Sequence, residues 1–319
     1  MAVSMLRMIA PTSTMPGLPE PQERDRLRIG ERFTVSFQRT LRVPEDGREY
    51  PLPPGCGPFG VYPVEALGEG GPPQWRSDGG HFITMYPSEA LWLGFGGADF
   101  KPNAVQVFAG SINAVSGAAG DEGLRDDPQN YIVAPLQPWL DGFNTSTGAI
   151  RQFVATVLGA GLSAEGQLIG AERRGGLDLL VYEPRPGIFE DRPPAAEAPA
   201  GPQHGAPMGL GAGGQIRQRV YRDPYGIDTW DPASVRRARV HILDSAAYRA
   251  LTGRPPPPTP VDAAAYMAAG LPWFDLYDED RPAVEGVEAL ARLSSTDAAH
   301  ADQDVAAGAA AAPLTRRNA

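Results

Sequence analysis

The clearest pattern in the chain is a strict alternation of apolar and polar residues near its start. Phe33, Val35 and Phe37 are separated by single polar residues. Successive side chains of a strand point to opposite faces, so this period of two predicts a half-buried strand within residues 27–43.

Short apolar runs continue to about residue 184, and clusters of glycine, proline, asparagine or aspartate end most of them. Many short strands at turn-marked spacing are typical of an antiparallel β-sandwich or jelly roll, which we predict for residues 27–184. Within it we expect a hairpin between 81–86 and 90–95, and a bulge at Gly110. The further strands that we expect are residues 59–67 at an edge, 104–115, both ends of 131–157, 166–169 and 177–182.

The second half of the chain has a different pattern. Residues 185–214 are rich in proline, alanine and glycine, which predicts a linker. Residues 215–292 are expected to form a smaller β+α portion packed on the sandwich. Its predicted elements are strands 215–221 and 239–243, a helix capped by Asp244-Ser245 that ends at Gly253, and a second short helix at 261–269. Residues 1–26 are expected to be a flexible N-terminus, and 293–319 a disordered tail.

Composition supports a β-rich fold and excludes some partners. The 319 residues include 38 glycines and 34 prolines, which favour turns and short strands over a helical bundle. The net charge is −10 and no basic run occurs, so a nucleic-acid partner is not expected. No run approaches the ~18 apolar residues of a membrane span. A protein partner or self-association stays open.

Cysteine and lysine usage bear on the compartment. Cys56 is the single cysteine, so neither an internal disulfide nor a cysteine metal site is available to this chain. The first 17 residues lack the apolar core of a signal peptide, and we expect a cytoplasmic protein. Lys101 is the single lysine among 28 Lys and Arg residues, which indicates the coding bias of a GC-rich bacterium.

Several catalytic motifs are missing from the sequence. It contains no P-loop, no Gly-x-Ser-x-Gly elbow and no closely spaced pair of histidines. A Gly-x-Gly-x-x-Gly match does occur at Gly209, Gly211 and Gly214. A dinucleotide site needs a strand before this motif and a helix after it. Here a proline-rich segment precedes and a predicted strand follows, so we interpret the glycines as a flexible loop.

The stretch 131–157 is the strongest candidate for a ligand site. Two β-rich runs flank a turn-forming centre, residues 138–148, in which Asp141-Gly142 is a tight-turn signal. One hypothesis makes this centre a binding loop, with Trp139 as an aromatic platform and polar anchors at Asp141, Asn144, Arg151 and Gln152. The alternative is a structural turn with Trp139 buried in the core. Trp230, in a second loop, is a further candidate for ligand contact.

Histidines and loop carboxylates are the candidates for catalysis. His81, Asp141, Asp223 and Asp228 could supply a general base and its partners if folding brings them together. His241 alternates with apolar neighbours and is interpreted as a hydrogen-bonded or solvated strand position.

No cofactor is expected, although clustered carboxylates in loops can hold Ca²⁺ or Mg²⁺. Turn-forming and solvating roles are the main interpretation of the acidic clusters. A metal site remains the alternative at Asp223, Asp228 and Asp231, or at Asp275, Asp278 and Asp280.

Three phrases resemble a family of conserved bacterial proteins: PWLDGFNTSTGAIRQFVA, DPYGIDTWD and GLPWFDLYDED. The similarity runs from about Phe33 to Asp280. It implies a folded bacterial protein and assigns no activity or site residue.

Two function classes follow from these patterns. The first is a non-catalytic binding or assembly protein that recognises a protein, a glycan or a small ligand through loops. The alternative is a carboxylate- or metal-assisted hydrolase that uses loop aspartates and a histidine. The missing nucleophile–base motifs favour the first.

Overall fold

The computed structural model describes residues 25–191, 207–252, 255, 260, 268 and 281–294. Most of the predicted flexible N-terminus, the middle of the predicted linker, nearly all of the second predicted helix and residues 295–319 of the predicted disordered tail lie outside these ranges. The fold is mainly β, as the sequence predicts.

In the described part of the chain, sixteen strands form one extensively paired sheet. Their bounds are β1 (Leu27–Ile29), β2 (Phe33–Thr40), β3 (Glu49–Tyr50), β4 (Gly55–Pro58), β5 (Tyr62–Pro63), β6 (His81–Met85), β7 (Ala90–Gly96), β8 (Asn103–Ala109), β9 (Ile112–Asn113), β10 (Ile132–Ala134), β11 (Trp139–Leu140), β12 (Gly142–Ser146), β13 (Ala149–Val157), β14 (Leu177–Tyr182), β15 (Pro207–Arg217) and β16 (Arg236–Asp244).

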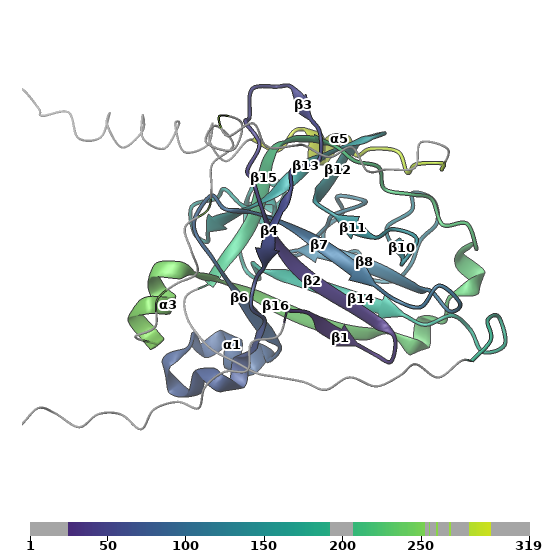
Figure 1. Ribbon diagram of the computed structural model, residues 1–319, viewed down its shortest axis with the longest axis horizontal. Coiled ribbons are helices and arrows are strands. Elements are labelled where there is room, and N and C mark those ends of the chain that lie inside the picture. The colour runs from purple at the N-terminus through teal and green to yellow at the C-terminus, as the bar shows by residue number, and fades with distance from the viewer. Residues whose placement is uncertain are drawn as a thin grey trace, which may run out of the picture.

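The helices of the same ranges are short. They are η1 (Val64–Gly70), α1 (Pro73–Asp78), α2 (Ala164–Ile169), η2 (Ile227–Thr229), η3 (Pro232–Ser234), α3 (Ser245–Thr252) and α5 (Glu288–Ala291). Figure 1 shows α1 and α3 at the lower left of the view and α5 at the top, beside β12. No helix of the described residues is long and apolar enough to cross a lipid bilayer.

The main path of the sheet is β1-β2-β7-β13-β15-β16-β14-β8-β10, and every pair along it is antiparallel. The parallel pairs, β3 with β15 and β6 with β16, lie off this path. Apolar residues on alternating positions of these strands meet in one core, which includes Phe37, Leu93, Phe153, Val240 and Leu179. The strand predicted from the alternation at Phe33, Val35 and Phe37 is therefore confirmed as β2, with these side chains fully buried.

The predicted hairpin between residues 81–86 and 90–95 is wrong. β6 pairs with β5 and β16, whereas β7 pairs with β2, β11 and β13. The turn between them is hydrogen-bonded to β13 and β2. The N–H of Ser88 donates to the Ala155 carbonyl, and the Glu89 carboxylate accepts from Arg39. These long-range contacts direct β7 away from β6.

Two local predictions are also corrected. Gly110 is not a bulge: it has a φ of 62° and forms, with Ser111, the two-residue turn that joins β8 to β9. Residues 166–169 are not a strand but belong to α2, whose first turn is capped by the Ser163 hydroxyl accepting from the N–H of Gly166.

The glycine-rich segment before residue 215 is not a flexible loop. Gly209, Gly211 and Gly214 lie in β15, which pairs with β13 along most of its length. A side chain at Gly214 would place its Cβ 2.5 Å from the Pro44 carbonyl oxygen, so glycine there permits a close backbone approach. The last part of the predicted linker is therefore a strand.

β15 and β16 occupy the middle of the strand order, between β13 and β14. Residues 207–244 thus complete the sheet itself instead of packing on it from outside. The predicted helix after Asp244 is confirmed as α3, because the Asp244 carboxylate accepts from the N–H groups of Ala246 and Ala247 at 2.9 and 3.0 Å.

Candidate ligand-binding pocket

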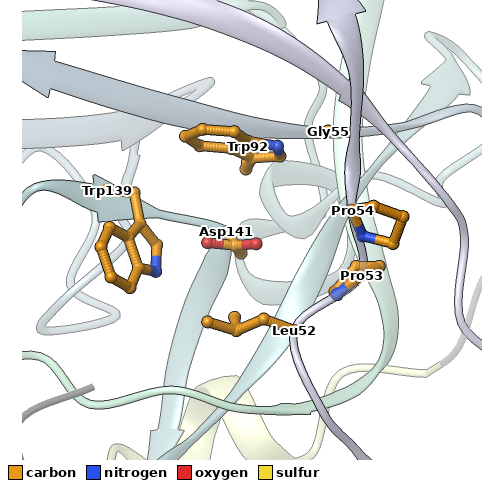
Figure 2. A pocket seen from close by; sticks show the side chains of 7 residues that line it. All are labelled: Leu52, Pro53, Pro54, Gly55, Trp92, Trp139 and Asp141. Carbon is orange, nitrogen blue, oxygen red and sulfur yellow. The ribbon is translucent and has the colours of Figure 1, made fainter. Parts of the chain in front are cut away.

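A cavity of about 190 Å³ lies where β7, β11 and the segment before β4 meet. Figure 2 shows its walls: two indole rings, a leucine and two prolines surround one carboxyl group. The lining residues are Leu52, Pro53, Pro54, Gly55, Trp92, Trp139 and Asp141.

The position of Trp92 follows from the alternation in β7. Leu91 and Leu93 point into the core, so Trp92 between them points to the outer face. Small neighbours leave room for its ring: a Cβ at Gly94 would lie 3.1 Å from the indole, and a Cβ at Gly55 would lie 3.4 Å from it.

The wall opposite the indoles is a rigid stretch of backbone. Pro53 and Pro54 have fixed φ angles. The Thr40 hydroxyl of β2 donates to the Pro54 carbonyl at 3.0 Å, and Gly55 pairs with Thr40 in the β2–β4 ladder. Leu52 is anchored in a small apolar cluster with Val43. The wall is therefore held in place by proline geometry, hydrogen bonds and apolar packing together.

Trp139 combines features of both sequence-based hypotheses. It lies in β11 opposite Gly94, packs against the apolar cluster of Leu52, and still keeps part of its surface exposed. Its Nε1 is buried and has no hydrogen-bond partner among the described residues. The indole is thus a half-buried wall of the pocket.

Asp141 lies between β11 and β12 and is only 3% exposed. Gln218 holds it at two points: the Asp141 N–H donates to Gln218 Oε1 at 3.0 Å, and Gln218 Nε2 donates to Asp141 Oδ1 at 2.6 Å. Burial raises the pKa of the Asp141 carboxyl to about 7, although the Gln218 hydrogen bond opposes the rise. The carboxyl group therefore changes its charge near neutral pH.

The other expected polar anchors have structural partners. Asn144 Nδ2 donates to the Glu285 carbonyl at 2.9 Å, which ties β12 to the segment before α5. Arg151 donates to the carbonyls of Gly213 and Leu293. Gln152 Nε2 donates to the Leu41 carbonyl at 2.7 Å. None of the three residues lines the pocket.

Trp230 is fully buried and offers no surface to a ligand. Its Nε1 donates to Asp223 Oδ2 at 2.8 Å, and the Tyr131 hydroxyl donates to the same oxygen at 2.6 Å. Asp223 is thus used to satisfy two buried donors of the core, which corrects the expectation that Trp230 displays a binding loop.

The structure does not bring the catalytic candidates together. His241 is buried, stacks on Trp75 and is hydrogen-bonded through Nε2 to the Gly79 carbonyl at 3.1 Å. Burial, with the nearby charge of Arg239, lowers the pKa of His241 to about 4. His81 borders a different cavity, beside Arg236, and Asp228 lies in the turn η2.

Metal ligands were expected only as the alternative for the acidic clusters. Across the described ranges, no three His, Cys, Asp or Glu side chains are grouped so that they could hold an ion. Asp231 caps η3 by accepting from the N–H of Ala233. The cluster at Asp275, Asp278 and Asp280 lies outside the described residues.

Sequence reasoning found Trp139 and Asp141 but missed the rest of the pocket. Trp92 carried a partial signal, since its alternation with Leu91 and Leu93 in a predicted strand places its ring on the face opposite theirs. Leu52, Pro53 and Pro54 carried none, because their contact with Asp141 joins parts of the chain far apart in sequence.

Comparison with protein-family models, curated proteins and solved structures found no match. The similarity of the three sequence phrases to a bacterial family therefore remains a prediction.

Proposed function

We propose that this chain is a non-catalytic binding protein that holds an organic ammonium group between Trp92, Trp139 and Asp141. The observation that carries the proposal is the placement of two indoles around one buried carboxyl group. It extends the hypothesis of a binding protein with Trp139 as its platform, and it selects a small cationic ligand among the classes considered.

Two attractions favour a cation in this pocket, one from the indole faces and one from the carboxylate. The face of an indole carries negative charge density and attracts a cation by about 0.5–2 kcal/mol, more when water is excluded. A carboxylate with little exposure is weakly screened, so its attraction for the same cation is stronger than at the surface. The net charge of −10 adds a long-range field that concentrates cations near the protein.

The size of the pocket limits what enters it. Its volume of about 190 Å³ is below the roughly 300–1,000 Å³ of sites that enclose a drug-sized ligand. One functional group is therefore held, and the remainder of the ligand lies outside. A sugar ring would need several hydrogen-bond partners, and Asp141 is the one side chain of the seven lining residues that carries an oxygen.

The hydrolase alternative is less well supported. A carboxyl group with a pKa near 7 in a cavity is a candidate for general acid–base catalysis. Hydrolysis also needs a second group that attacks or protonates the substrate. Of the seven described residues that line the pocket, Asp141 alone titrates, and no candidate partner among His81, Asp223 and Asp228 lines it.

The test compares a cation with a neutral molecule of the same shape. Choline and 3,3-dimethyl-1-butanol, in which carbon replaces the nitrogen, are titrated at about pH 8, where Asp141 is ionised. Intrinsic tryptophan fluorescence and isothermal calorimetry report binding. Choline is expected to bind saturably, and the neutral alcohol at least about tenfold more weakly.

Asp141→Asn and Asp228→Asn form a matched pair of variants, since both remove one carboxylate. Asp228 does not line the cavity, so its replacement should leave the affinity for choline unchanged. Equal affinity for choline and the alcohol, or unaltered choline binding by Asp141→Asn, would contradict the proposal.

A further inference from the structure

The pocket offers very few hydrogen-bond acceptors to a bound cation. Asp141 Oδ1 already accepts from Gln218 Nε2. Asp141 Oδ2 takes part in no hydrogen bond among the described residues, since Gln218 is the one side-chain partner of this carboxyl group there. The other lining side chains are hydrocarbon or indole, and the Pro54 carbonyl already accepts one hydrogen bond, from Thr40.

Ammonium groups differ in how many donors they bring. A primary ammonium has three N–H donors, as a lysine side chain does. In this pocket Asp141 Oδ2 is the side-chain oxygen left for one donor, and any donor that finds no acceptor loses its water without a replacement, which opposes binding. A tertiary ammonium has a single N–H, so its one donor matches the one available oxygen.

We infer that the pocket selects a tertiary ammonium group with small alkyl substituents, such as a dimethylammonium, over primary and quaternary ammonium groups. The inference depends on the proposed function, because it specifies the ligand of the same site. The single N–H donates to Asp141 Oδ2, and the two methyl groups contact the indoles of Trp92 and Trp139.

Hydrocarbon contacts also favour an ammonium group that carries methyl substituents. Leu52 and Pro53 are buried and present carbon atoms to the cavity. Each methyl group placed against them leaves water, which favours binding. A fourth substituent on nitrogen removes the N–H, and with it the charge-assisted hydrogen bond, which is stronger than a neutral one.

The experiment uses four butyl compounds that differ only at nitrogen: butylamine, N-methylbutylamine, N,N-dimethylbutylamine and the butyltrimethylammonium ion. Calorimetric titration of the full chain at about pH 8 keeps the amines protonated and Asp141 ionised. The dimethyl compound is expected to bind about tenfold more tightly than butylamine and more tightly than the trimethyl ion. Butylamine binding as tightly as the dimethyl compound, or the trimethyl ion binding most tightly, would overturn the inference.

The outcomes separate this inference from the proposed function. If all four cations bind with equal affinity, the selectivity is wrong and the ammonium site stands. If none binds, both fail. In Asp141→Asn the preference for the dimethyl compound over the trimethyl ion should disappear, because the charged acceptor is gone. A preference that persists in this variant would contradict the role of Oδ2.

Discussion

At the scale of single residues, Asp141 is the unusual group of this protein. An aspartate that is 3% exposed normally has a cationic or multiple hydrogen-bonding partner. Here its one side-chain partner among the described residues is the neutral amide of Gln218, and the pKa rises to about 7. Because this buried carboxylate has no cationic partner among the described residues, a cationic ligand beside it would supply the missing opposite charge.

Asp141 should make the stability of the protein depend on pH. Its pKa is about 7 in the folded chain, against 3.8 for an unperturbed aspartate. The folded state thus binds the proton more tightly, so stability falls as the pH rises from about 4 to about 7 and is flat above. Asp141→Asn keeps an oxygen for Gln218 and has no charge.

The variant is therefore expected to match the parent near pH 4 and to exceed it at about pH 8, by up to roughly 4 kcal/mol. Urea denaturation at the two pH values measures this difference. A stability gap of the same size at both would show that Asp141 is not the titrating group.

Trp139 allows a second prediction at this scale. Its Nε1 is buried without a partner among the described residues, which is unfavourable. Trp139→Phe removes that donor and keeps most of the ring, so the free energy of unfolding should stay level or rise. Trp139→Ala removes a half-buried ring and should lower it by about 2 kcal/mol.

The denaturant midpoints of Trp139→Phe and Trp139→Ala test these two expected changes in stability. The affinity for choline is measured on the same variants. Choline should bind more tightly to Trp139→Phe than to Trp139→Ala, because a phenyl ring keeps part of the aromatic face that attracts a cation. If Trp139→Phe destabilised as much as Trp139→Ala, the Nε1 group would have to be making a hydrogen bond.

At the scale of elements, sequence patterns were least successful in predicting a strand that contains many glycines. The segment before residue 215 has the composition of a loop, yet it forms β15 because its glycines allow close contact with neighbouring chain. A Cβ at Gly214 would meet the Pro44 carbonyl oxygen at 2.5 Å and Val43 Cγ2 at 2.7 Å. Such contacts join residues far apart in the chain, so a short stretch of sequence does not reveal them.

Gly214→Ala should therefore destabilise the protein by about 1–3 kcal/mol, the usual range for an overpacked position. Gly70→Ala is the matched control, because a Cβ there meets nothing within 4 Å. Thermal or urea unfolding of both variants gives the comparison. Equal stability of the two variants would contradict this prediction, because it would show that the backbone around Gly214 shifts at no cost to make room for the methyl group.

Apolar patterns predicted strands well, both where one face is buried, as in β2, and where both faces are buried, as in β14. β2 and β14 were located from their apolar residues because these side chains meet the core at every second position or along the whole run. Pairing was predicted poorly. The order of β6 and β7 depends on Glu89, Arg39 and Ala155, which local sequence does not connect.

At the scale of the whole molecule, one sheet brings the two halves of the chain together. β15 and β16 insert between β13 and β14, and Gln218, just after β15, fixes Asp141 beside β11. The pocket therefore depends on contacts between residues near 52, 92, 140 and 218. Sequence alone identified two of its seven lining residues, since long-range pairing assembles the others.

A cation that binds against Asp141 must drive the carboxyl group to its ionised form, because a nearby positive charge lowers the pKa of an acid. Tetramethylammonium is a suitable probe, since its own charge does not vary with pH. Calorimetry in two buffers with different ionisation enthalpies counts the protons released.

Near pH 7, where Asp141 is about half protonated, the binding of tetramethylammonium should release about half a proton per cation. Release should rise toward one proton at about pH 6, where free Asp141 is mostly protonated, and vanish at about pH 9, and Asp141→Asn should show none. Saturable binding with no proton released near pH 7 would contradict the account.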